Sequence, residues 1–205
     1  MSTSVKERPI LFSAPMVRAI LNGSKSMTRR IMKPQPAYVC GHDNEEPWDS
    51  GDTLIACPYG AIGSRLWVRE SIRLVERYTM PGDGPEDPPE ELAASEYMAD
   101  GALTVADAWP WKAKALPSIH CPRGLSRITL EITDVRVQRL HEISEEDAKA
   151  EGITPKDADT NGCDGYGHAF ANLWESIHGA GSWDASPWVW AISFKRVEAT
   201  HEPRV

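Results

Sequence analysis

The sequence contains no apolar run long enough to cross a bilayer or to serve as the core of a signal peptide. We therefore expect a cytoplasmic protein with no membrane partner. Cysteine is scarce: the four residues, at positions 40, 57, 121 and 163, form no C-x-x-C pair, so reduced thiols are expected rather than a disulfide framework. Phenylalanine is also scarce, with 3 residues, whereas 8 tryptophans provide either core bulk or a stacking surface.

Positive charge is outnumbered, with 22 Lys and Arg against 30 Asp and Glu and a formal net charge of -8. This balance argues against a general polyanion binder. The distribution is uneven, however. Residues 1–36 carry a single acid, Glu7, while the charged residues of 83–100 are all acidic. The basic residues of the first segment are Lys6, Arg8, Arg18, Lys25, Arg29, Arg30 and Lys33. A local basic surface on an acidic protein favours a small or localised anionic ligand.

The hydrophobic pattern predicts an α+β fold without internal repeats, a small antiparallel sheet or barrel with short flanking helices. Three helices are expected, over 13–23, 143–153 and 169–179, and three strand regions, over 65–75, 127–140 and 188–197. Within the strand regions, a bulge or bend is expected near Asp134, where the apolar parity changes, and Glu70 falls on an apolar face. A carboxylate there needs a cation or several donors, unless the strand ends in solvent.

Common catalytic and metal-binding patterns are missing. The residues Cys40, His42, Cys57, His120 and Cys121 show no zinc-knuckle spacing, so no metal is expected. The sequence also has no G-x-S-x-G elbow and no glycine-rich phosphate loop. What remains is the stretch "NGSKSMTRRIMKPQ", residues 22–35, which gathers cations and hydroxyls just after a predicted helix.

Lys25 and Thr28 lie three residues apart, so a turn or helical bend would place both side chains on one side. The neighbouring arginines disfavour the ammonium form of Lys25 and so lower its pKa, which suits a general base acting on a hydroxyl. Glu151 stands at a predicted helix C-terminus, where the helix dipole favours a raised pKa. For either residue alone, solvent exposure without function is the alternative.

These residues resemble the signature of the ASCH domain family, in which a short helix runs into G-x-K-x-x-T-x-R. The matching positions are Gly23, Lys25, Thr28 and Arg30. "GSRLWVRE" resembles the family's following strand, with Ser64 where Asp is usual, and "TLEITDVRVQRLHEISEEDAKAEGI" resembles its strand and helix ending in a glutamate. The closing "LWESIHGAGSWDASPWVWAISFKRV" is similar to the end of the longer, prophage-encoded members.

The resemblance implies a PUA-like β-barrel and, for the small bacterial members with this motif, a metal-free amidohydrolase that removes the acetyl group of N4-acetylcytidine. It places the catalytic roles on Lys25, Thr28 and Glu151, with no cofactor. Substrate contacts are expected from Arg29, Arg30, Trp67, Arg69 and Glu70, with Trp67 as a stacking surface for the base.

Residues 1–205 are therefore predicted to form one ASCH-type domain with loop insertions at about 37–56 and 76–120, acting on an N4-acylated cytidine or a related nucleoside or base. Three alternatives remain open. The first is a non-catalytic binder of RNA or modified nucleotides, and the second is a ribonuclease for single-stranded RNA. The third is a phage interaction protein whose tryptophan-rich end forms the contact surface. The expected partner is a small nucleoside or RNA, and the sequence does not define an oligomeric state.

Overall fold

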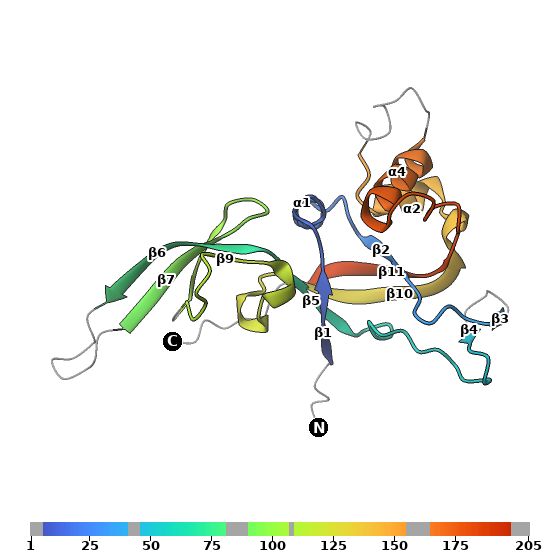
Figure 1. Cartoon of the computed structure of the whole chain (residues 1–205), viewed down its shortest axis with the longest axis horizontal. Helices are drawn as coiled ribbons and strands as arrows, with labels where there is room; N and C mark the ends of the chain where they lie inside the picture. The colour runs from blue at the N-terminus through green and yellow to red at the C-terminus, as the bar shows by residue number, and fades with distance from the viewer. Residues whose placement is uncertain (1–5, 41–45, 81–89, 107–108, 155–164, 198–205) are drawn as a thin grey trace. The chain divides into compact units, whose positions relative to one another are not determined.

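A computed structural model describes residues 6–40, 46–80, 90–106, 109–154 and 165–197. Along the chain its strands and helices are β1 (Glu7–Leu11), α1 (Ala14–Leu21), β2 (Met27–Ile31), β3 (Tyr38–Cys40), β4 (Glu46–Trp48), β5 (Arg65–Arg69), β6 (Ile72–Met80), β7 (Glu90–Tyr97), β8 (Leu103–Ala106), β9 (Ala115–Leu116), β10 (Thr129–Arg139), α2 (Glu145–Ala150), α4 (Tyr166–His178) and β11 (Trp188–Val197) (Figure 1). Single 3-10 turns cover Ser118–His120, Arg123–Leu125 and Leu140–Glu142. The predicted α+β class is confirmed, and the described residues are mostly strand with few helices.

The chain divides into two compact units rather than forming a single one. The first contains residues 1–8, 19–66 and 130–197, and the second contains residues 9–18, 67–129 and 198–205. The predicted catalytic residues all belong to the first unit, whereas the predicted insertion at 76–120 belongs to the second. The prediction of one ASCH-type domain with loop insertions stays a prediction.

A five-stranded sheet runs in the order β1-β5-β10-β11-β2. β2 lies at its edge and pairs antiparallel with β11, with Val189 opposite Ile31 and Ser193 opposite Met27. Among the described strands no pairing joins β2 back to β1, so a closed barrel stays a prediction. β10 is an uninterrupted 11-residue strand whose buried positions change parity between Ile132 and Val137, as the sequence around Asp134 indicated.

Figure 1 shows α2 and α4 on the same side of β10, β11 and β2. The core beneath these helices consists of the buried residues Leu140, Ala148, Ile153, Ala169, Phe170, Trp174 and Val189. Ile31 of β2 packs against this core, and alternation along the strand places Met27 and Arg29 on the same face. Ile177 is 53% exposed, because it lies in the last turn of α4, beyond the buried Phe170 and Trp174.

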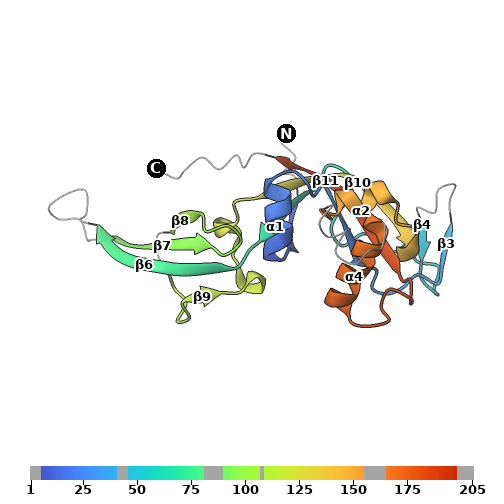
Figure 2. The ribbon, with the colours of Figure 1, turned by 90° about the horizontal axis from the view of Figure 1, so that it is seen from above.

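The second unit carries its own four-stranded sheet, in the order β8-β7-β6-β9. Figure 2 shows β6 and β7 running side by side. Its core consists of the buried residues Ile72, Ala93, Tyr97, Trp109, Leu116 and Cys121. The prediction that 76–120 is a loop insertion is therefore wrong for 76–80, 90–97, 103–106 and 115–116, which form strands. Alternate small and aromatic residues along β7 form a buried face that the acidic composition concealed.

The other predicted insertion, 37–56, contains the short hairpin of β3 and β4, with Tyr38 opposite Trp48. Cys40, Cys57 and Cys121 are free thiols, while Cys163 and His42 lie outside the described residues. Among the described helices, none has the length and apolar character needed to cross a bilayer.

Candidate functional site

Lys25 and Glu151 meet directly although 126 residues separate them. Their backbones form an antiparallel bridge, and neighbouring bonds from Lys25 N to Ala19 O and from Ser26 N to Ala150 O hold the two segments together. The Nζ atom of Lys25 donates to Oε2 of Glu151 at 2.7 Å and to the Glu151 carbonyl at 2.8 Å. The two side chains are 0% and 5% exposed, respectively, so the contact is a buried ion pair.

Gly152 makes this approach possible. Its φ of +90° lies in the left-handed region that favours glycine, and it ends α2 directly after Glu151, which is the C-cap. A Cβ at this position would lie 3.1 Å from the Cβ atoms of both Ala19 and Lys25. The glycine therefore serves two needs at once, the turn at the end of the helix and the close passage of the Lys25 segment.

Arg29 extends the same cluster on one face of β2. Its guanidinium contacts Asp147 Oδ2 at 2.5 Å and Glu151 Oε1 at 3.4 Å, and it lies 5.9 Å from the ring centroid of Phe170 in α4. Arg136 of β10 contacts the same Asp147 carboxylate at 3.3 Å. Because both partners of Arg29 come from the α2 region, the arginine anchors α2 against the sheet.

Burial is the main influence on the charge of Lys25. It lowers the pKa of the Lys25 ammonium, the ion pair with Glu151 opposes this, and the positive charges of Arg30 and Arg29 lower the pKa further. The pKa of Lys25 is below its ordinary value despite the carboxylate partner. A proton shared between a buried amine and a buried carboxylate can pass from one to the other, which leaves a neutral amine and a neutral acid.

Thr28 and Arg30 lie on the other face of β2, because side chains alternate along a strand. Thr28 pairs with Ile192, is 3% exposed, and makes no side-chain hydrogen bond within the described chain. The pKa of Arg30 is lowered by burial, and Tyr59 and Glu151 oppose that shift. Arg30 also acts on Lys25 and on His178, lowering the pKa of each. Arg30 thus lies within electrostatic reach of the Lys25–Glu151 pair from the Thr28 face.

Trp67, Arg69 and Glu70 belong to the second unit. Trp67 is 8% exposed and the Arg69 guanidinium lies 5.0 Å from its ring centroid, so Arg69 would have to move before a base could stack there. Glu70 is 2% exposed and accepts from Arg127 with both carboxylate oxygens, at 3.1 and 2.8 Å. The expectation that Glu70 needs a cation is confirmed. This pairing disfavours its predicted role as a substrate ligand, because both oxygens are occupied.

Asp147 has a second role that was not predicted from the sequence. Its backbone N–H donates to the Ser144 hydroxyl at 3.1 Å, as part of the helix cap. Its carboxylate, however, binds Arg29 and Arg136. The available signal was its spacing from Glu151, since positions i and i+4 share one side of a helix. His178 follows the same spacing, because it lies four residues after Trp174 on α4, and the two tilted rings have centroids 4.2 Å apart.

The chain matches no protein-family model, and no curated protein matches it. Among solved structures it is similar to a DUF984 protein from Enterococcus faecalis V583, with a TM-score of 0.43 and 9% identity over 100% of this chain and 89% of that one. It is also similar to an ASCH domain from Lactobacillus crispatus JV V101, with a TM-score of 0.43 and 13% identity over 94% and 80% of the two chains. Likeness at this level assigns neither a family nor a function.

Proposed function

We propose that the first unit is a metal-free amidohydrolase that cleaves the exocyclic amide of an N4-acylated cytidine or a related modified base. The observation that carries the proposal is the buried contact of Lys25 with Glu151 at 2.7 Å. Stability alone gives little reason for burying such a pair, because its desolvation offsets most of the attraction between the charges. Perturbed, buried ionisable groups concentrate at functional sites.

In the proposed reaction, the proton of the Lys25 ammonium first passes to the Glu151 carboxylate. The Thr28 side chain must then turn from the opposite face of β2 toward neutral Lys25, which accepts its hydroxyl proton. The Thr28 oxygen attacks the amide carbonyl carbon. Collapse of the tetrahedral intermediate breaks the bond to N4, which leaves as an amine with a proton from Glu151. Water then attacks the threonyl ester and gives a proton to the Glu151 carboxylate, while the Lys25 ammonium returns a proton to the departing Thr28 oxygen. The carboxylic acid and free Thr28 are released.

The two arginines have different roles in this scheme. Arg29 is engaged by Asp147 and Glu151, so it is a positioning residue that holds α2 and the Glu151 carboxylate. Arg30 shares a face of β2 with Thr28, and its positive charge stabilises the oxyanion that forms on the amide carbonyl.

The proposal is tested by measuring acetate release from N4-acetylcytidine with the wild-type protein and with Lys25→Met, Thr28→Val and Glu151→Gln. Each substitution is expected to reduce kcat at least 100-fold, since general-base catalysis contributes about 10²- to 10⁴-fold. Thr28→Ser keeps a hydroxyl and should retain activity, and Lys195→Gln, at a lysine side chain that is 60% exposed, is the matched surface control. Absence of acetate release by the wild-type protein would contradict the proposal. Release unchanged by Thr28→Val would instead remove Thr28 as the nucleophile and leave water as the attacking group.

One observation favours a second candidate, a module that binds RNA or a modified nucleotide without catalysis. The Lys25 side chain is 0% exposed and is held by two oxygens of Glu151, which is the arrangement of a structural pair. In the same assay, this candidate predicts salt-sensitive retention of single-stranded RNA with no product formation. Shortening of the RNA would identify a ribonuclease instead.

A further inference from the structure

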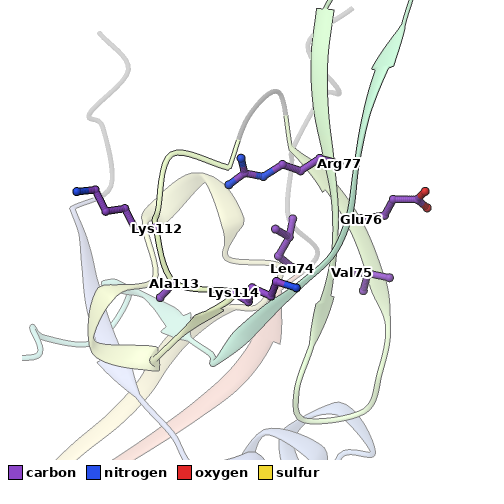
Figure 3. Close-up of a pocket in the computed structure, with 7 residues that line it drawn as sticks. All are labelled: Leu74, Val75, Glu76, Arg77, Lys112, Ala113 and Lys114. Carbon is purple, nitrogen blue, oxygen red and sulfur yellow. The ribbon is translucent and has the colours of Figure 1, made fainter.

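A pocket lies in the second unit, and none of the predicted site residues lines it. It is a pocket of about 310 Å³ between residues 74–77 of β6 and residues 112–114 (Figure 3). This volume is at the lower end of the range of ligand pockets, roughly 300 Å³ and above. The pocket is therefore large enough for a small group rather than for a protein surface.

The charged residues of the lining are mostly cations. Arg77, Lys112 and Lys114 contribute to it, against the single acid Glu76, beside the apolar Leu74, Val75 and Ala113. Figure 3 shows that Arg77 points from β6 toward the 112–114 segment, whereas the Glu76 carboxylate points to the opposite side of the strand. A register shift between Leu74 and Glu76 interrupts the pairing with β7 just before these two residues. A positive pocket in a chain of net charge -8 stands out from its surroundings.

Hydrogen bonds to backbone carbonyls hold the segment that provides the lysines. Leu74 N donates to Lys114 O at 2.8 Å, and Trp109 Nε1 donates to Ala113 O at 2.9 Å. Arg77 donates to the Trp109 carbonyl at 3.3 Å. These bonds fix the pocket wall before any ligand arrives, which lowers the ordering cost of binding.

A tryptophan, Trp111, lies next to the lysine segment in the sequence. Trp111 directly precedes Lys112, is only partly buried, and packs edge-on against the buried Trp109 with centroids 4.8 Å apart. A base can stack on an indole while its phosphate contacts nearby ammonium and guanidinium groups, which is how single-stranded nucleic acids are held without sequence preference.

We propose that this pocket binds the phosphate ester of a nucleotide, with Arg77, Lys112 and Lys114 contacting the phosphate and Trp111 stacking on the base. The phosphate ester belongs to a free mononucleotide or to a single-stranded RNA. This binding is independent of the activity proposed for the first unit, so Lys195→Gln, at an exposed lysine of the first unit, should leave it unchanged.

The test uses cytidine monophosphate, followed by tryptophan fluorescence, and a fluorescein-labelled single-stranded octaribonucleotide, followed by anisotropy at several KCl concentrations. The double substitution Lys112→Gln/Lys114→Gln, and separately Arg77→Gln, should weaken binding at least 10-fold. For the RNA, the slope of log K against log[KCl] should fall in magnitude by about 1.4 when two phosphate contacts are lost. Arg73→Gln is the matched control, because Arg73 lies on the same strand but is already paired with Glu96.

Saturable binding of cytidine monophosphate identifies the mononucleotide as sufficient, whereas binding of the octamer alone identifies a strand as the source of the phosphate. Binding of either probe supports the proposal if the pocket variants lose it and Arg73→Gln keeps it. Binding of both probes by the pocket variants at wild-type strength would overturn it. Equal competition by sulfate at the same concentration would also overturn it, because it would show a site for any anion.

Discussion

At the scale of single residues, two buried carboxylates show how one charge depends on another far away in the sequence. Glu70 is held by Arg127, which also contacts Asp100 at 2.9 Å and lies over the Tyr97 ring at 4.0 Å. Glu151 is held by Lys25 and Arg29. In both cases the partner matters mainly because a buried carboxylate without one is costly.

Arg127→Met should destabilise the second unit by about 3 kcal/mol or more, because it leaves the Glu70 carboxylate buried and unpaired. The double variant Arg127→Met/Glu70→Gln should recover much of that loss, since the charge is removed with its partner. Urea unfolding followed by circular dichroism measures both. A cost below about 1 kcal/mol for the single variant would show that water reaches Glu70.

Lys25 makes the free energy of unfolding depend on pH. Its pKa is lower in the folded protein than the ordinary 10.5, so between those two values the unfolded state binds more protons. The free energy of unfolding therefore rises with pH across this window and levels off above about 10.5. Lys25→Met should flatten the rise between pH 7 and pH 10, whereas Lys195→Met should not. An unchanged slope in Lys25→Met would place the pKa of Lys25 at its ordinary value.

At the scale of elements, α2 determines the geometry of the candidate site. The Ser144 side chain caps its start, Asp147 in its first turn binds Arg29, and Glu151 caps its end beside Lys25. The N-cap, the first turn and the C-terminal end of this short helix therefore position the carboxylates of Asp147 and Glu151. The helix has only 6 residues, so its stability depends on these contacts rather than on helix propensity.

Gly152→Ala should destabilise the first unit by more than Gly63→Ala, which provides a matched comparison. Both glycines have positive φ, +90° and +83°, so both substitutions carry the left-handed cost of about 1 kcal/mol. Only at position 152 would the new Cβ also press on Lys25 and Ala19, at 3.1 Å, because nothing lies within 4 Å at position 63. Thermal unfolding measures the difference, and equal losses would contradict the close packing.

At the scale of the whole molecule, two of the clusters of buried residues among the described residues belong to different units, one beneath α2 and α4 and one in the region of the β8-β7-β6-β9 sheet. α1, β1, β5 and β10 each have residues in both units. The chain therefore passes between the two units more than once.

Ile153→Val in the first unit and Ile72→Val in the second should each cost about 0.5–1.5 kcal/mol. Ile153 and Ile72 belong to clusters of buried residues in different units. Each substitution should therefore speed amide hydrogen exchange mainly in its own unit. Exchange read by mass spectrometry locates the effect. Acceleration spread evenly over both units after either substitution would show that the chain opens as one cooperative body.

Local patterns explain the elements that the sequence predicted correctly. Ser144, Asp147 and Gly152 mark the ends of α2, and Ser13 accepts the first helical bond of α1 from Val17. The alternation in 188–197 gives β11. Each of these features depends on residues within about four positions of one another, so the sequence displays them directly. Strand β7 was missed because the acidic composition of its segment concealed the alternation of buried residues along it.

The sequence by itself determined the helices, the main strands, the α+β class and the need of Glu70 for a cation. Only the tertiary structure decided that this cation is Arg127, 57 residues away, and that Asp147 binds Arg29 across 118 residues. It likewise brought Lys25 to Glu151, a pairing that the motif resemblance implied but that local physics did not predict. The reason is that periodicity and capping act along the chain, whereas the partner of a buried charge is set by which segments the core brings together.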